Sequence, residues 1–237
     1  MDTRRLMSRR FEVLALDEAI ELCYQRGWTD GLPVVPPTEE RVAAFLDVVK
    51  HEPSDVVGVV NTRGSVITAE KVAINAVMAG CRPEYMPVVL AAVDAICQEQ
   101  FNPHGSQART GGSAVLLVIS GPIRKKLGFN SGTNLFGPGP EWRANATVGR
   151  AVRLILLNVC GNLPGVMDRS TLGHPGKYTY CIAEDEENSP WEPLHVERGL
   201  PREASAVTAF AALGPLQVEN RRGDSGEAIL TAIADSM

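Results

Sequence analysis

The sequence lacks a long apolar segment, has few aromatic residues and carries no strong excess of either charge. Aromatic residues make up 5% of its 237 residues, charged residues 22% and hydrophobic residues 44%. No apolar run approaches the roughly 20 residues that span a bilayer, which argues against an integral membrane protein. The net charge of −5 and the pI of about 5.5 argue against general nucleic-acid binding. The apolar and charged fractions are typical of globular chains and exclude a disordered or collagen-like protein.

Familiar motifs for metals, disulfides and nucleotides are also missing. The five cysteines are an odd number and form no CxxC pair, so we expect reduced thiols and a cytoplasmic protein. The four histidines form no HxH or HExxH motif, so spacing predicts no metal site. The spacing does not exclude a catalytic site assembled from residues that are distant in the sequence. Neither GxxxxGK[ST] nor a GxGxxG after a strand occurs, and the sequence leaves the cofactor unknown.

The sequence predicts a single domain that lies between two polar terminal segments. The opening MDTRRLMSRR is basic, but acids follow at once where a secretory signal needs an apolar region. We therefore expect a flexible N-terminus over residues 1–15 and a single domain over 16–218. Residues 219–237 read as a polar C-terminal tail with one short helix over 226–234.

Hydrophobic spacing and capping residues predict an α/β or α+β domain, a single layered domain with a mixed sheet flanked by helices. Asp17, Thr38 and Thr68 are predicted helix N-caps, and Gly80 ends the helix that Thr68 begins. The run AVLLVI at 114–119 predicts a central strand covered on both faces. Helices are expected over 16–26, from 39, and over 69–79, 83–98 and 145–159, and further strands over 56–60, 177–183 and 206–212.

Charge is divided unevenly along the chain. Residues 1–100 and 183–237 are acidic, with net charges of −5 and −7, whereas residues 101–182 carry +7 and 13 of the 22 glycines. Glycine-rich, arginine-bearing segments suit carboxylates or phosphates, and the loop 128–145 leads into a predicted helix N-terminus. This favours a small-anion site. The alternative is that these cations simply face the acidic segments within the fold.

Cys81 is the candidate nucleophile and two histidines are the candidate proton carriers. Cys81 lies at the start of a predicted helix beside Arg82, which would lower its thiol pKa, although a cysteine between helices is more often only buried. His104 and His174 lie in loops that contain glycine, and an imidazole is a common general acid or base. The candidate substrate-binding residues are Arg82, Arg109, Asn130, Asn134, Arg143, Asn145, Lys177, Tyr180 and His195.

Four long stretches resemble a bacterial family of poorly characterised proteins. They are WTDGLPVVPPTEERV, VAINAVMAGCRPEYMPVVLAAV, WRANATVGRAVRLILLNV and GHPGKYTYCIAEDEENSPWEPLHVERG. In that family a protein with a UGSC or CGSC motif, a selenocysteine or cysteine protein, is encoded beside or fused to such a domain. This chain lacks the motif, so the resemblance implies a reactive sulfur or selenium in a partner subunit.

Two functions follow as hypotheses. The first is an enzyme or enzyme subunit that acts on a small anionic or polar metabolite by thiol- or selenol-assisted redox, lyase or hydrolytic chemistry. The second is a non-catalytic binding or assembly subunit that docks a partner protein. In either case we expect an oligomer that binds neither nucleic acid nor membrane.

Overall fold

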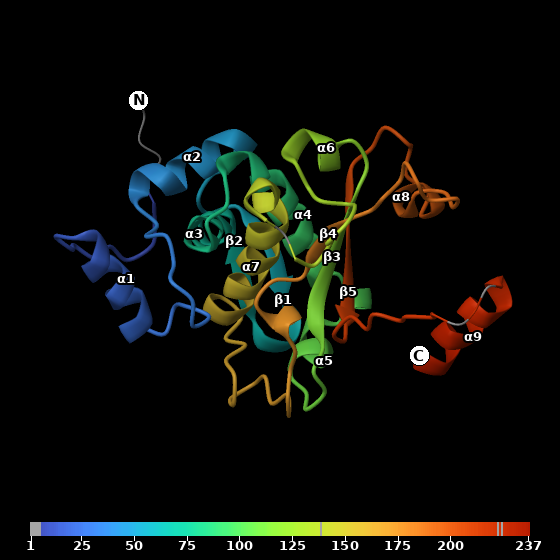
Figure 1. Ribbon diagram of the computed structural model, residues 1–237. Helices are drawn as coiled ribbons and strands as arrows, with labels where there is room; N and C mark the ends of the chain where they lie inside the picture. Colours follow the sequence, from blue (N-terminus) through green and yellow to red (C-terminus); the bar gives the residue numbers. More distant parts are fainter. Residues whose placement is uncertain (1–5, 138, 222, 224) are drawn as a thin grey trace.

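The computed structural model describes residues 6–137, 139–221, 223 and 225–237 (Figure 1). Its strands are β1 (Val56–Val60), β2 (Ser65–Thr68), β3 (Ala114–Ser120), β4 (Cys181–Ala183) and β5 (Ala206–Ala212). Its α-helices are α1 (Leu16–Gln25), α2 (Glu39–Val49), α3 (Ala69–Ala79), α4 (Met86–Cys97), α5 (Pro103–Gln107), α6 (Ile123–Leu127), α7 (Arg143–Asn158), α8 (Leu194–Glu197) and α9 (Gly226–Ser236). Short 3-10 helices are η1 (Asn61–Arg63), η2 (Pro83–Tyr85), η3 (Glu99–Phe101), η4 (Pro140–Trp142) and η5 (Pro175–Lys177).

A small mixed sheet organises the second half of the chain. Its strand order is β4-β3-β5, with β4 parallel and β5 antiparallel to the central β3. The carboxyl ends of β3 and β4 therefore lie at one edge, where Ser120 ends one strand and Glu184 follows the other. β1 and β2 form a separate antiparallel hairpin. This mixed sheet flanked by helices confirms the predicted α/β domain.

The hydrophobic core joins the helices to one face of this sheet. α3 packs along α7, and α4 packs against β5, as the ribbon shows (Figure 1). Leu117 and Ile119 of β3 are fully buried, and each such burial stabilises the fold by about 2 kcal/mol. On α7, Val148, Val152 and Ile155 face the same core at the predicted helical spacing.

The second face of the sheet is only partly covered. Leu116 and Val118 of β3 are half-buried, and their neighbour Phe210 on β5 is 39% exposed. The prediction of a central strand is confirmed, but the prediction that both its faces are covered is wrong.

The predicted start of α2 and both predicted ends of α3 are confirmed, and capping residues fix them, whereas α4 and α7 differ from their predicted bounds by one to three residues. The side chain of Thr38 accepts a hydrogen bond from the Arg41 N–H, and Gly80 ends α3 with a φ of +86°. Thr68 caps α3 in the same way. Asp17 is not a cap, because α1 begins at Leu16 and Asp17 lies in its first turn. The strand expected over 177–183 is reduced to β4, because Pro175 and Gly176 start the 3-10 helix η5.

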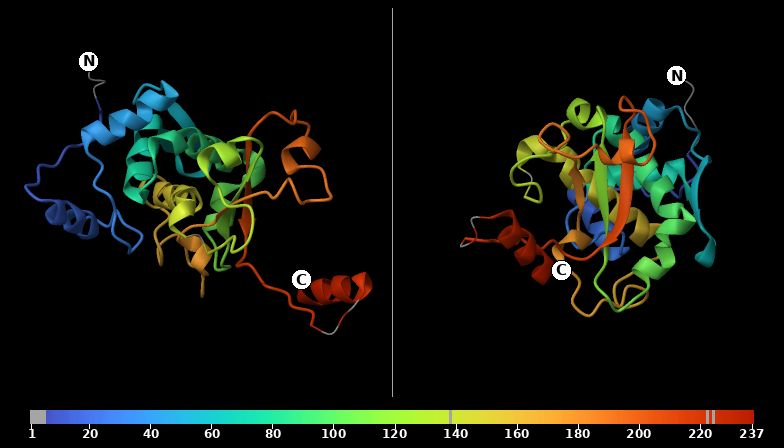
Figure 2. Two further views of the ribbon diagram at one scale, coloured as in Figure 1. Left: turned by 45° about the horizontal axis from the view of Figure 1, so that its top comes forward. Right: turned by 90° about the vertical axis from the view of Figure 1, so that its right-hand side faces the viewer.

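The two ends of the chain differ in how they contact the body. The N–H groups of Met7 and Ser8 donate to the carboxylate of Glu70 on α3, and the rest of the stretch 6–15 contains no helix or strand. α9 confirms the predicted C-terminal helix and stands away from the body at the end of an extended segment, with none of its residues buried (Figure 2). Among the described residues, no helix has the length and apolar character required to cross a membrane.

Candidate functional site

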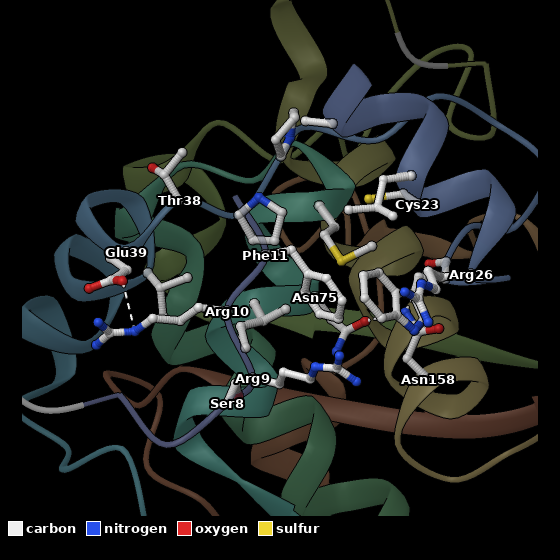
Figure 3. A pocket seen from close by; sticks show the side chains of 18 of the residues that line it. Ser8, Arg9, Arg10, Phe11, Cys23, Arg26, Thr38, Glu39, Asn75 and Asn158 are labelled. Carbon is white, nitrogen blue, oxygen red and sulfur yellow. Dashed lines mark hydrogen bonds and ion pairs between the residues drawn. The ribbon is translucent and has the colours of Figure 1, made fainter. Parts of the chain in front are cut away.

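A cavity of about 720 Å³ lies between the N-terminal segment and the helical side of the domain (Figure 3). The stretch 6–13, α1, the loop before α2, one face of α3 and the end of α7 line it. Its size falls within the range of small-molecule sites. The sequence did not predict it, because its outer wall comes from residues without regular structure.

Glu70 attaches that wall to α3. Its carboxylate is buried and accepts the Met7 N–H at 2.9 Å and the Ser8 N–H at 2.8 Å. The neighbouring Lys71 donates from its Nζ to the hydroxyl of Ser8. Burial alone would raise the pKa of Glu70, but the hydrogen bonds from Ser8 and Met7 outweigh it and lower the pKa. Glu70 is therefore a charged anchor for the N-terminal segment.

The floor of the cavity is apolar, with two amides at one side. Cys23 and Met78 are buried and line it. The Asn158 Nδ2 donates to the Asn75 Oδ1 at 2.7 Å and to the Trp28 carbonyl at 3.0 Å. These bonds hold α7, α3 and the loop after α1 together beneath the cavity.

Two arginines and an aromatic ring form the rim. The guanidinium groups of Arg9 and Arg26 lie 4.9 and 5.2 Å from the centroid of the Phe11 ring, within cation–π distance. Phe11 meets Trp28 edge-on at 5.3 Å. Arg10 pairs with Glu39, whereas Arg9 and Arg26 form no ion pair with any described residue. Their charged N–H donors are therefore available to an anion.

The predicted residues Asn130 and Asn145 do come together, but they support the backbone. The Asn145 Oδ1 accepts the Asn130 N–H at 2.8 Å, and its Nδ2 donates to the carbonyls of Asn130 and Cys181. Asn134 lies beside them, with its carbonyl 3.5 Å from the Asn130 Nδ2. Both Asn130 and Asn145 are buried, so these amides stabilise the loop before α7.

The prediction of a lowered thiol pKa at Cys81 is wrong. Burial raises the pKa of Cys81 to about 12, and a hydrogen bond with Thr147 and the charge of Arg143 only partly offset it. Arg143 is exposed, and its guanidinium donates to the carbonyls of Gly80 and Cys81. Burial also raises the thiol pKa of the remaining cysteines, which are Cys23, Cys97, Cys160 and Cys181.

His174, Lys177 and Tyr180 form a second group, at the start of β4. The His174 ring meets the Tyr180 ring edge-on at 5.5 Å, and its Nδ1 accepts the Gly176 N–H. Lys177 donates to the buried Asp168 at 2.7 Å. Burial alone would raise the pKa of Asp168, but the bonds from Lys177 and Ser170 lower it. This lysine is therefore paired rather than free for a substrate.

The remaining predicted residues are scattered. His104 lies exposed on α5, and Arg82 and Arg109 are exposed on loops. No described contact joins His104 to Cys81 or to His174. The predicted residues therefore do not form one site around Cys81.

His195 differs from the other histidines because it is buried beside two carboxylates. It is 1% exposed on α8, and one of its ring nitrogens lies within 4.8 Å of carboxylate oxygens of Glu184 and Glu186. These three residues could hold a metal ion at the carboxyl edge of β3 and β4. None of them lines the cavity.

The positive middle segment mostly faces acidic residues. The buried Arg124 pairs with Glu186 at 2.8 Å and with Glu187 at 3.1 Å, and Arg150 pairs with Asp30 at 2.8 Å. Hydrogen bonds from Arg124 and Lys125 lower the pKa of Glu187 to about 2. These pairs support the alternative of internal charge compensation over an anion site in residues 101–182.

Comparisons with protein-family models, with curated proteins and with solved structures gave no match to this chain.

Proposed function

We propose that this chain binds a small metabolite in the N-terminal cavity and provides the substrate pocket of an enzyme or enzyme subunit. The observation that carries this proposal is that the guanidinium groups of Arg9 and Arg26 both lie over the Phe11 ring at the rim and form no ion pair with any residue that the structure describes. The ligand is expected to combine an anionic group with an apolar body.

The chemistry of the lining determines that ligand class. Guanidinium groups bind carboxylate or phosphate through charge-assisted hydrogen bonds. Phe11, Trp28 and Met78 offer apolar surface for the remainder of the ligand. The amide of Asn158 lies at the inner end, where it can orient a polar substituent.

The reactive group is expected to come from outside this chain's own thiols. Every cysteine has a raised pKa, so thiol nucleophiles of this chain stay protonated at neutral pH. This favours a partner subunit that carries a CGSC- or UGSC-type motif, with redox, lyase or hydrolytic chemistry at the shared site. Free thiols throughout the chain support a cytoplasmic location.

An anionic aromatic dye, 8-anilinonaphthalene-1-sulfonate, tests the pocket directly. We expect saturable binding by the native protein, and about tenfold weaker binding by Arg26→Gln, which corresponds to about 1.4 kcal/mol. Arg198→Gln is the matched control, because Arg198 is exposed and does not line the cavity. Equal loss of affinity in the two variants would contradict the proposal.

Displacement of the dye then identifies the ligand class. Phenylacetate should compete better than the neutral phenylacetamide, because only the former carries a charge for Arg9 and Arg26. This difference should shrink in the Arg26→Gln variant.

The C-terminal tail favours the second candidate function, an assembly role. α9 has no buried residue, and its Ile229, Leu230 and Ile233 are 47%, 67% and 40% exposed. An isolated helix of 11 residues is marginal in water, so its apolar side needs a partner surface. We take a second copy of this chain as that partner.

Light scattering after size-exclusion chromatography tests this role. The full chain should form an oligomer, and a chain that ends at residue 218 should be smaller by at least half. A monomeric full chain would contradict self-association and would direct attention to a CGSC-type partner.

A further inference from the structure

We propose that Glu184, Glu186 and His195 bind a divalent transition-metal ion at the carboxyl edge of β3 and β4. One carboxylate oxygen from each glutamate and one imidazole nitrogen lie within 4.8 Å of one another. The site is independent of the metabolite pocket proposed above, since none of the three residues lines that cavity.

The ring of His195 is oriented as a metal ligand. Its side chain is fully buried, and the Nε2 faces the carbonyl of Arg202 at 3.4 Å. A carbonyl can only accept, so the Nε2 carries the proton and the Nδ1 presents a lone pair. Metal-bound histidines commonly donate their other ring N–H to a backbone carbonyl in this way.

The Nδ1 of His195 lies close to a carboxylate but forms no hydrogen bond with it. It lies 3.9 Å from the Oε1 of Glu186 and has no hydrogen-bond partner. Both atoms are acceptors, and 3.9 Å is too long for a hydrogen bond. A buried acceptor without a donor is costly, and a cation placed between these two atoms would satisfy the Nδ1. The Oε1 already accepts the Gly121 N–H and would bind the cation through a second lone pair. The oxygen of Glu184 in the same cluster supplies a third ligand.

Other groups hold the two carboxylates in place. The Ser120 hydroxyl donates to Glu184 at 2.8 Å, and the Leu194 N–H donates to the same carboxylate. The Gly121 N–H donates to Glu186 at 2.5 Å, and Arg124 pairs with its other oxygen at 2.8 Å. Each carboxylate oxygen has more than one lone pair, so these donors orient the ligands without using up their capacity to coordinate.

The ligand set indicates the metal class. Two carboxylates and one imidazole suit Zn²⁺, Mn²⁺ or Fe²⁺ better than a soft ion. Three protein ligands leave at least one coordination position for water or substrate, as in catalytic zinc sites. The side chain of Glu186 is 14% exposed, which gives an ion a route to the buried histidine.

Titration calorimetry with Zn²⁺ alone, on protein treated with EDTA and then freed of it, tests the site. The experiment uses a His51→Gln background, because the exposed His51–Asp55 pair could bind Zn²⁺ by itself. We expect one ion per chain and a raised midpoint of thermal unfolding. Mn²⁺ followed by electron paramagnetic resonance is the second probe, since thiols bind it poorly.

Glu187→Gln provides a matched control for Glu186→Gln. Both glutamates pair with Arg124, but only Glu186 belongs to the cluster. Zn²⁺ affinity should fall by about 30-fold or more in Glu186→Gln and should change by less than about threefold in Glu187→Gln. His195→Gln should lose Zn²⁺ binding while unfolding near the temperature of the metal-free parent.

The outcomes separate a metal site from an internal ion pair. Absence of stoichiometric Zn²⁺ and Mn²⁺ binding by the parent overturns the proposal, as does equal loss in the two glutamate variants. If His195→Gln fails to fold, the comparison of Glu186→Gln with Glu187→Gln decides alone.

Discussion

Asp30 shows how a single charge connects distant parts of the chain. Its carboxylate accepts two bonds of 2.8 Å from the Arg150 guanidinium and is almost fully buried, and the same arginine donates to the carbonyls of Leu32 and Pro33. Burial alone would raise the pKa of Asp30, but the hydrogen bond and charge of Arg150 lower it. The pair therefore fastens the loop after α1 to α7.

Asp30→Asn is expected to lower the free energy of unfolding at pH 7 by about 3 kcal/mol, because it leaves the partly buried Arg150 without its charged partner. A lowered folded-state pKa stabilises the protein above the unfolded value of about 4, and the benefit is lost as pH falls through the folded value. Urea unfolding at pH 7 and pH 3 should therefore show a smaller difference between variant and parent at pH 3. Asp235→Asn, at an exposed position on α9, should change neither value.

Thiol reactivity gives a second expectation at the residue scale. At pH 6, iodoacetamide should leave Cys81 and Cys181 unmodified in the native protein, because burial keeps both as neutral thiols. Peptide mass analysis should find modification at the half-buried Cys97 first. Denaturation in guanidinium should make all five sites react. Fast alkylation of Cys81 in the native protein would contradict this expectation and would support a role for Cys81 as a nucleophile.

At Gly149, the close packing of β4 against α7 decides which residue is tolerated, more than helix propensity does. It lies within α7, where a Cβ would be 2.5 Å from the Thr179 Oγ1 and 2.6 Å from the Tyr180 backbone nitrogen. Alanine normally favours a helix over glycine by about 1 kcal/mol. Here the added methyl group would push β4 away from the helix that covers it.

Gly149→Ala is therefore expected to destabilise the protein by about 1–3 kcal/mol, measured by chemical unfolding. Gly226→Ala offers the opposite case, because a Cβ added there, at the start of α9, would meet no described atom within 4 Å apart from its chain neighbours and its own helix backbone. That variant should be neutral or slightly stabilising. A stabilised Gly149→Ala protein would show that α7 and β4 are less closely packed than described.

Sequence patterns located elements well where local chemistry sets their limits. Thr68 and Gly80 mark both ends of α3, and the apolar run at 114–119 marks β3, because caps and hydrophobic spacing act within a few residues. The cavity escaped prediction because the contact that forms its wall joins Ser8 to Glu70 across 62 residues. The raised pKa of Cys81 was not predicted either, since burial depends on packing between elements that the sequence pattern does not show.

At the scale of the whole molecule, the two ends should respond differently to truncation. Removal of residues 1–13 deprives the buried Glu70 of its donors and should cost about 1–3 kcal/mol. Removal of residues 219–237 takes away no buried side chain of α9 and should leave the unfolding midpoint of a dilute sample nearly unchanged. Circular dichroism melts of both truncated chains check this contrast. Equal midpoints would mean that the N-terminal segment does not contribute to the fold.

The order of strands also has a consequence for the protein during its synthesis. β3 pairs with β5, which lies about 90 residues later in the chain. At about 5–20 residues per second, a ribosome needs roughly 5–20 s to deliver that partner. The apolar strand AVLLVIS has both edges unpaired until β4 is made, and the edge that β5 covers stays unpaired for the whole interval, a state prone to aggregation. A lower growth temperature and added chaperones should therefore improve the yield of folded protein more than substitutions of its surface residues would.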